Sequence, residues 1–270
     1  MLELEFAELS DTGPSRGKNE DYCGHVLPAT PEAAEARGWC FAIADGVGGQ
    51  ANGEVASRLA IETLLSRLPS VSVSERLTVA LPRLIQTANQ MVYEASADSL
   101  RSGGMATTIV ACVLRYDRAT VAHVGDSRCY LVRRGEATAL TRDHTVAAEQ
   151  SRMGILTPRQ AATASTAYLL SRSLGSELIV NVDVSEHLLT PGDVLMLCTD
   201  GLHRSVTPSD MVAAVRPKED LKAAAARLVS LANTRDGSDN VSVQLIRIRA
   251  VESVGMYRGR LYKLPRAPQP

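Results

Sequence analysis

The sequence has no excess of charge of either sign, since 29 lysines and arginines stand against 30 aspartates and glutamates. Proteins that bind nucleic acid or anionic membranes through their overall charge carry a clear basic excess. The apolar stretches also stay well short of the ~18 residues of a membrane span. We therefore expect a protein that binds neither nucleic acid nor membrane.

The five cysteines form no C-x-x-C pair and are scattered over the chain. An odd number of isolated thiols, most of them in apolar segments, suits a reducing compartment better than a disulfide framework. The opening residues MLELEFAELSDTG alternate apolar and acidic side chains, unlike a signal peptide with its basic start and apolar block. The expected location is the cytoplasm.

Short strand-like segments dominate the pattern, and the first, at 2–9, alternates with a period of two. The others lie near 21–26, 39–44, 106–114, 119–125, 127–133, 181–187, 193–199 and 240–249. Tight turns such as Arg134-Gly135 join several of them. Connections this short favour antiparallel pairing, because a parallel crossover needs a dozen residues or more.

Longer segments, at 51–68 and 221–232, carry apolar residues on one helical face. A third helical region, 74–99, contains Pro82, which predicts a kink or a helix start near that residue. Strands and long helices do not alternate regularly, and no internal repeat is visible. This mixture predicts an α+β fold with helices on the outer faces of the sheets.

Two segments stand apart from this core. Residues 145–170 lie between strand regions and contain a helix start at Thr157-Pro158, which predicts an inserted subdomain. After the last strand the chain is basic and contains prolines, typical of a disordered tail or of a peptide that docks on a partner. We predict one domain over residues 1–250, with the insertion at about 145–170, and a tail over 251–270.

Four aspartates stand beside turns where apolar stretches end or begin: Asp45, Asp126, Asp200 and Asp239. A single Asp-Gly pair is only a turn signal. Strands that deliver four carboxylates to neighbouring sheet ends, with Glu20-Asp21 beside them, would need cations to neutralise them. No Cys or His spacing competes for a metal, so oxygen ligands favour Mg²⁺ or Mn²⁺ over Zn²⁺.

The glycine-rich segment GVGGQANG at 46–53 leads into a predicted helix, where phosphate could be cradled. It lacks the spacing of both the P-loop and the Rossmann fingerprint. Close approach of its backbone to a metal or substrate explains the glycines better.

In their order along the chain, the motifs resemble the metal-dependent Ser/Thr protein phosphatase family (PPM, the PP2C type), and most of all its bacterial members. The matching segments are SRGKNED (15–21), ADGVGG (44–49), GMATTIVACVL (104–114), VAHVGDSR (121–128), LTRDHT (140–145), CTDGL (198–202) and SDNVSV (238–243). The resemblance implies two antiparallel β-sheets packed as a sandwich, with helices on both outer faces (αββα). It also implies a flap at 145–170 and a two-metal site at one edge of the sandwich.

Residue by residue, the resemblance implies that Asp45 bridges two Mn²⁺ or Mg²⁺ ions. Asp200 and Asp239 would complete one ion's site, and the carbonyl of Gly46 would serve the other.

The remaining matches are less direct. Glu20, with Asp21 near it, would act through metal-bound water, and Asp126 matches a third, weaker metal position together with Asp200. Arg16 matches the arginine that binds the substrate phosphate, where a planar guanidinium can hold two oxygens at once.

The implied activity is hydrolysis of phosphoserine and phosphothreonine in proteins by a hydroxide that bridges the two metal ions. The phosphorylated partners would include a Ser/Thr kinase and its substrates in signal transduction, and the enzyme is expected to be a monomer. One departure is Val47, where some members have a histidine that can protonate the leaving group. His144 is a conceivable substitute, with a structural role as the alternative.

Two other functions compete with catalysis. A phosphatase fold that only binds would lack a core aspartate, and none is missing here. An acid-rich Ca²⁺ module would show an EF-hand loop, and the sequence contains no D-x-[DN]-x-[DN]-G run. The sequence therefore favours an active enzyme.

Overall fold

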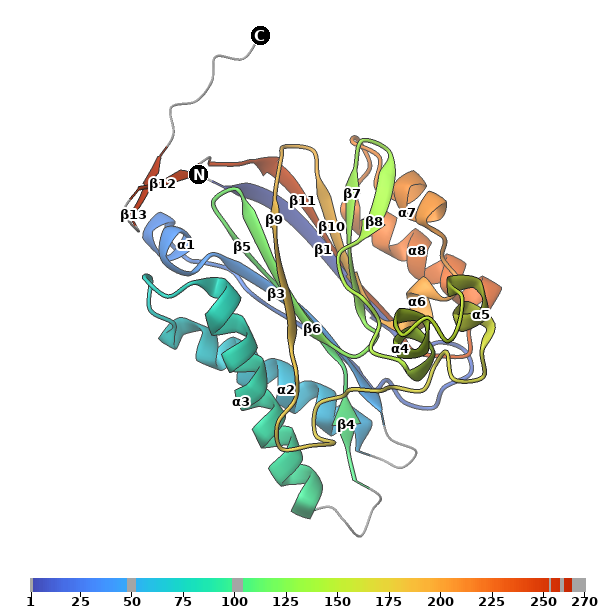
Figure 1. The fold of residues 1–270 in the computed structure, drawn as a ribbon. Helices are drawn as coiled ribbons and strands as arrows, with labels where there is room; N and C mark the ends of the chain where they lie inside the picture. The colour runs from blue at the N-terminus through green and yellow to red at the C-terminus, as the bar shows by residue number, and fades with distance from the viewer. Residues whose placement is uncertain (1, 48–51, 99–103, 253, 258–259, 264–270) are drawn as a thin grey trace.

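The computed structural model describes residues 2–47, 52–98, 104–252, 254–257 and 260–263. Two antiparallel sheets lie face to face with helices on both outer sides, which confirms the predicted α+β sandwich (Figure 1). One sheet has the order β1-β11-β10-β7-β8 and the other the order β2-β3-β5-β6-β9, with β4 paired to β3.

The first sheet consists of β1 (Glu3–Asp11), β11 (Val241–Ala250), β10 (Val194–Cys198), β7 (Arg128–Arg133) and β8 (Glu136–Ala139). The second consists of β2 (Asp21–Val26), β3 (Trp39–Val47), β5 (Ile109–Arg115), β6 (Arg118–Val124) and β9 (Asp183–Leu188), with β4 at Ala106–Thr107. The turn between β7 and β8 has positive φ at both Arg134 and Gly135, at 52° and 81°. A two-residue hairpin loop with positive φ at both residues matches the right-handed twist of the two strands that it joins.

Apolar side chains from both sheets fill the space between them, among them Phe41, Ile43, Leu195, Leu197 and Ile246, all fully buried. Central strands such as β5 are buried on both faces, which explains their nearly continuous apolar sequence. Each face of the sandwich thus needs a further layer to cover it.

Helices supply these outer layers. The long pair α2 (Gly53–Arg67) and α3 (Leu77–Asp98) packs on the second sheet, and α7 (Pro208–Ala214) and α8 (Leu221–Arg235) pack on the first. Shorter helices are α1 (Pro31–Arg37), a 3-10 turn η1 (Leu68–Ser70) and α6 (Asp200–His203). The helix α3 begins at Leu77 and continues through Pro82, so the predicted start near that residue is late by five residues.

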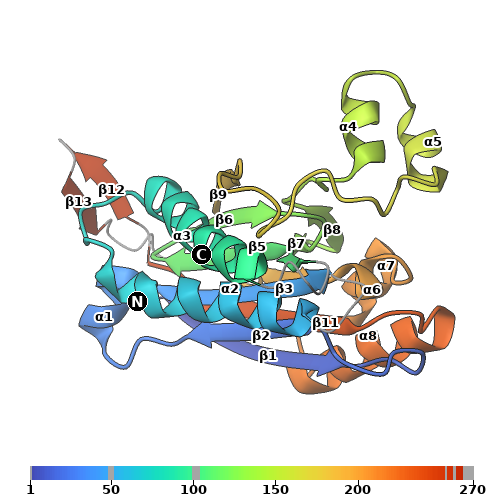
Figure 2. The ribbon, with the colours of Figure 1, turned by 90° about the horizontal axis from the view of Figure 1, so that it is seen from below.

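The insertion contains α4 (Val146–Arg152) and α5 (Pro158–Thr163), which stand away from the sheets (Figure 2). Thr157 caps α5 as predicted: its hydroxyl accepts from the Gln160 backbone, and the Gln160 side chain accepts from the Thr157 backbone N–H. The insertion is anchored at its base by a bridge between Thr145 and Leu170. We refer to residues 145–170 as the flap.

Two predictions about segments differ from the structure. The expected strand at 106–114 is divided into β4 and β5, because Thr108 turns its backbone N–H to the Asp45 carbonyl at 2.8 Å. The tail was expected to be disordered or a docking peptide, and the first alternative is wrong for the residues of β12 (Val254–Tyr257) and β13 (Arg260–Lys263), which pair as a hairpin and so satisfy backbone groups that a disordered tail would leave to water.

All five cysteines are unpaired. None of the described helices is long and apolar enough to cross a membrane.

Candidate metal centre

Acidic side chains from both sheets meet at one edge of the sandwich. The register of β2 and β3 pairs Asp21 with Asp45 across the second sheet. Asp200 follows β10, and Asp239 precedes β11, in the first sheet. The Thr199 hydroxyl donates to Asp21 Oδ2 at 2.9 Å, and therefore joins the two sheets directly at this edge. Asp126 follows β6 and lies at the same edge. We call the five aspartates the acid cluster: Asp21, Asp45, Asp126, Asp200 and Asp239.

Burial is the main cause of unusual electrostatics in the acid cluster. Desolvation, with repulsion from neighbouring aspartates, raises the pKa of both Asp21 and Asp126 to about 7. The same causes raise the pKa of Asp45 well above its usual range. These carboxyl groups thus cannot all ionise cheaply without added positive charge.

Two carboxylate oxygens show where that charge fits. In the described part of the chain, Asp21 Oδ1 and Asp200 Oδ1 are buried and have no hydrogen-bond partner. An unsatisfied buried carboxylate oxygen is costly, and a hard divalent cation is the partner that satisfies several such oxygens at once. The residues present therefore fit Mg²⁺ or Mn²⁺.

Gly46 lies against the acid cluster and admits no side chain. A Cβ there would come within 2.2 Å of the Gly53 carbonyl oxygen. Its N–H donates to the Glu20 carbonyl at 3.0 Å. A Cβ on Gly53 would in turn meet Glu20 Oε1 at 2.8 Å and the Gly46 carbonyl oxygen at 2.9 Å. Glycine at both positions thus leaves room for the Glu20 carboxylate and the Gly46 carbonyl oxygen to lie close together.

The rest of the glycine-rich segment, residues 48–51, lies outside the described residues. Val47 ends β3 and is exposed.

Two arginines face the acid cluster. Arg16 Nη2 lies 2.8 Å from Asp239 Oδ1, and Arg16 Nε donates to the Ser238 carbonyl at 3.0 Å. Arg204 pairs with Asp200, four residues before it, and its Nη1 lies 3.9 Å from Asp239 Oδ2. Sequence reasoning predicted Arg16 and missed Arg204, although the i,i+4 spacing from Asp200 was a usable signal.

Asn240 is a second residue that sequence reasoning missed. Its buried side chain accepts from the Glu20 N–H at 2.8 Å and donates to the carbonyls of Thr12 and Lys18 at 2.8 and 2.9 Å. These bonds hold the loop that carries Arg16 and Glu20 against the start of β11. Asn240 thus fixes the position of this loop beside the acid cluster.

The histidines near the acid cluster are neutral. Burial lowers the pKa of His203 to about 3, and its Nε2–H donates to the Asp126 carbonyl at 2.9 Å. Burial and His123 lower the pKa of His144 to about 4. His144 is buried and its Nδ1 accepts from the Gly125 N–H at 3.1 Å, which favours the structural role over that of a general acid.

His144 also lies near His123 and Asp183, a group whose spacing could suit a metal. Because His144 Nδ1 accepts a backbone hydrogen bond, its Nε2 must carry the ring proton and faces Asp183 Oδ2 at 3.4 Å. A protonated nitrogen cannot bind a metal. His123 Nε2 also bonds to the Arg142 carbonyl at 2.7 Å, so both rings serve the structure through backbone hydrogen bonds.

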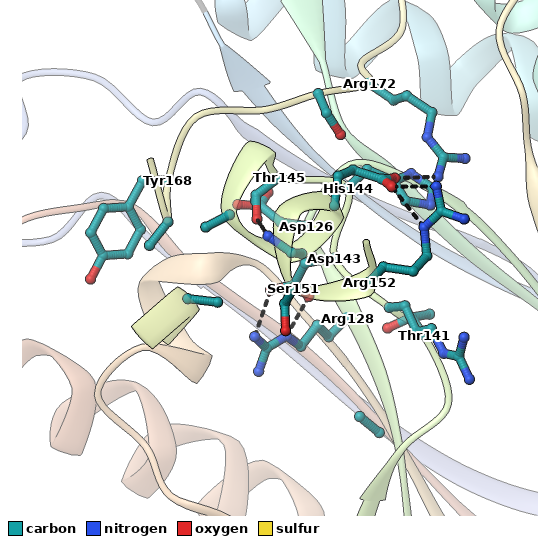
Figure 3. Close-up of a pocket in the computed structure, with 18 of the residues that line it drawn as sticks. Asp126, Arg128, Thr141, Asp143, His144, Thr145, Ser151, Arg152, Tyr168 and Arg172 are labelled. Carbon is teal, nitrogen blue, oxygen red and sulfur yellow. Dashed lines mark hydrogen bonds and ion pairs between the residues drawn. The ribbon is translucent and has the colours of Figure 1, made fainter. Parts of the chain in front are cut away.

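A cleft of about 1610 Å³ opens between the flap and the acid cluster. Asp126 and Arg204 belong to its lining, and Figure 3 shows Tyr168 and Arg172 on opposite sides of it. The ion pairs in its wall include Arg128, which bonds both oxygens of Asp143 at 2.7 and 2.6 Å, and Arg172, which bonds Glu149 at 3.0 Å. The cleft thus leads directly to the acid cluster.

Comparison with known proteins gives consistent results. The sequence profile described as Protein phosphatase 2C matches residues 14–241. The serine/threonine phosphatase stp of Listeria monocytogenes serotype 4b is 32% identical over 207 residues, which cover 76% of this chain and 82% of the Listeria protein.

Solved structures agree with this likeness. The serine/threonine phosphatase of S. agalactiae aligns with a TM-score of 0.83 and 32% identity, covering 92% of this chain and 100% of that one. The catalytic domain of the serine/threonine phosphatase PstP, solved in complex with 2 manganese ions, aligns with a TM-score of 0.78 and 30% identity over 92% of this chain and 100% of that one.

The raised pKa of Asp21 predicts a pH-dependent effect of Asp21→Asn in the metal-free protein. The folded pKa is about 7 against an ordinary 3.8, so the protonated form stabilises the fold at low pH and that contribution is lost as pH rises between these values. Relative to wild type, we expect Asp21→Asn to gain roughly 1 to 4 kcal/mol in unfolding free energy between pH 4 and pH 8. Urea unfolding at both pH values measures this gain.

Saturating Mn²⁺ is the control for this measurement, because the wild-type carboxylate then has a cation partner. Under that condition we expect the gain to disappear or to change sign. An equal gain with and without Mn²⁺ would show that Asp21 does not face a cation.

The contacts of Asn240 predict that Asn240→Ala costs about 2 to 3 kcal/mol of unfolding free energy, since three buried hydrogen bonds are lost. The matched control is Asn233→Ala, which removes one bond to Asp11 at 3.0 Å, with an expected cost near ~1 kcal/mol. Denaturant unfolding measures both variants. Equal costs would contradict a special role of Asn240.

Proposed function

This chain belongs to the protein phosphatase 2C family, the metal-dependent serine/threonine protein phosphatases, and from that membership we propose how its own residues perform the reaction. The enzyme hydrolyses phosphoserine and phosphothreonine in proteins and uses Mn²⁺ or Mg²⁺. The observation that carries the proposal is the acid cluster, in which buried carboxylates from two sheets lack the charge that would balance them.

Within this proposal, Asp45 would hold both cations, and Asp200 and Asp239 would complete the site of one. The Gly46 carbonyl would hold the other cation, and Glu20 and Asp21 would support it through bound water. Asp126, with Asp200, offers a third and weaker position. The orphaned oxygens of Asp21 and Asp200 and the shared space of Glu20 and Gly46 support these assignments.

The chemistry that bound Mn²⁺ or Mg²⁺ supplies is activation of a water molecule and neutralisation of phosphoryl charge. We propose that Arg16 binds the phosphoryl group. The Arg16 side chain lies at the rim of the acid cluster, is 45% exposed, and carries a planar guanidinium that suits two phosphoryl oxygens. Asn240 fixes the position of the loop that carries Arg16 beside the acid cluster.

The leaving serine or threonine oxygen needs a proton. His144 and His203 are buried and neutral, and Val47 has no proton to give. We propose that a solvent molecule in the cleft donates this proton. The peptide on either side of the phosphorylated residue lies in the same cleft against the flap.

The substrates are phosphorylated proteins, and we propose that they include a Ser/Thr kinase and its targets. We further propose that the enzyme acts in the cytoplasm as a monomer. Residues 1–250 form its catalytic domain, with the flap at about 145–170 and the tail at 251–270. The profile match at 14–241 lies inside the proposed domain.

The proposed function predicts that activity on a phosphothreonine peptide is lost with EDTA and restored by Mn²⁺. Asp45→Asn should lower kcat by roughly 100-fold or more, because it removes a charged group shared by both cation sites. Steady-state kinetics and calorimetric Mn²⁺ titration measure the two effects. Full activity of the metal-free enzyme, or normal Mn²⁺ binding by Asp45→Asn, would contradict the proposal.

Arg16→Lys should raise KM for the phosphopeptide, because a point charge replaces a bidentate fork. We expect roughly a 10-fold increase, about 1.4 kcal/mol, with Mn²⁺ affinity retained. The matched control is Arg235→Lys, since Arg235 lies on the surface and pairs with Asp210 at 2.6 Å. Unchanged kinetics of Arg16→Lys would place Arg16 outside the phosphate site.

A further inference from the structure

Arg204 occupies an unusual place between the acid cluster and the flap. It follows the short helix α6, and its guanidinium pairs with Asp200 and approaches Asp239 Oδ2 at 3.9 Å. The guanidinium carbon also lies 4.0 Å from the ring centroid of Tyr168, near the base of the flap. The side chain is only 24% exposed. A permanent cation is thus held by two carboxylates and one aromatic ring.

Asp239 is faced by an arginine at each of its oxygens, Arg16 at Oδ1 and Arg204 at Oδ2. The two pairs differ in one respect. Arg16 is also bonded to the Ser238 carbonyl at the rim, whereas Arg204 reaches Asp200, which is almost fully buried. Arg204 therefore supplies positive charge on the same side of the acid cluster where one cation is proposed to bind.

We propose that Arg204 is an internal competitor of the divalent cation at Asp200 and Asp239, and that Tyr168 helps to hold it there. The inference rests on the proposed function, because it takes these two aspartates as ligands of one cation. Arg204 pairs with Oδ2 of Asp200, whereas Oδ1 of the same carboxylate has no partner and is the oxygen open to a cation. The guanidinium already neutralises part of the charge of these two carboxylates and repels a second positive charge beside it, so its presence lowers cation affinity.

Tyr168 links this competition to the flap. A guanidinium over an aromatic face gains a favourable cation–π interaction. The ring stabilises the position in which Arg204 covers the carboxylates, so any movement of Tyr168 with the flap changes how easily a cation enters. Arg204 is thus a positioning residue that sets metal affinity and connects it to the flap.

Calorimetric titration of metal-free, full-length protein with Mn²⁺ tests the proposal without relying on activity. Arg204→Gln should bind one Mn²⁺ roughly 3- to 10-fold more tightly than wild type, in line with loss of one partly exposed ion pair. Arg204→Lys, which keeps the charge but not the planar fork, should give an intermediate affinity. The control Arg235→Gln removes a surface arginine that also pairs with an aspartate, and should match wild type.

Thermal unfolding gives an independent measurement on the same variants. Metal-free Arg204→Gln should melt below wild type at pH 7.5, because the acid cluster loses a counter-charge. Its melting temperature should then rise more on addition of Mn²⁺. An unchanged or weaker Mn²⁺ affinity of Arg204→Gln would overturn the proposal.

The role of Tyr168 is tested by a double-mutant cycle. Tyr168→Leu should tighten Mn²⁺ binding by a smaller factor than Arg204→Gln, and should have no effect when Arg204 is already glutamine. Tyr168→Phe keeps the ring and should match wild type. An equal effect of Tyr168→Leu in both backgrounds would overturn the link to the flap.

Asp45→Asn separates a failure of this inference from a failure of the proposed function. If Asp45→Asn loses a cation while Arg204→Gln binds like wild type, the competition by Arg204 is wrong and the metal centre stands. If Asp45→Asn binds Mn²⁺ like wild type, the ligand assignment itself is wrong, and the Arg204 inference is overturned with it.

Discussion

Repulsion among buried carboxylates is the constraint on which the rest of this structure depends. Aspartates from β2, β3, the end of β10 and the start of β11 reach one edge of the sandwich, where burial raises the pKa values of Asp21, Asp45 and Asp200. A fold stabilised only by its core would gain nothing from such a cluster. The arrangement becomes favourable when divalent cations lie between the acids. The same buried carboxylates therefore destabilise the metal-free fold and bind the cations on which activity depends.

Rigid elements hold the cluster together against that repulsion. Thr108 accepts from the Asp45 N–H at 3.0 Å, and Thr199 connects Asp21 to the Ser242 N–H at 3.0 Å. Asn240 secures the loop that carries Glu20. Each contact uses a strand or a strand end, where the backbone has little freedom to relax. The sandwich thus pre-organises oxygen donors and keeps their spacing when the cations are absent.

The site is selective for cations with oxygen ligands because the nearby histidine nitrogens are already used in hydrogen bonds. His144 and His203 use their ring nitrogens in backbone hydrogen bonds and stay neutral. Arginines supply the remaining positive charge, with Arg16 at the rim and Arg204 between the acids and Tyr168. The phosphate, the cations and the flap therefore meet in one electrostatic network, in which movement of one group changes the balance for the others.

The sequence alone determined the features that depend on local patterns: antiparallel strands from short turns, the Thr157 cap of α5, and the turn aspartates Asp45, Asp126, Asp200 and Asp239. The tertiary structure decided what depends on contacts between distant segments. It brought Asn240 to Glu20, closed Gly53 against Gly46, removed His144 from solvent and set Arg204 between Asp200 and Tyr168. Periodicity and turn chemistry act over a few residues, whereas burial, the tautomer of a histidine and the partner of an arginine are fixed only when the sheets pack together.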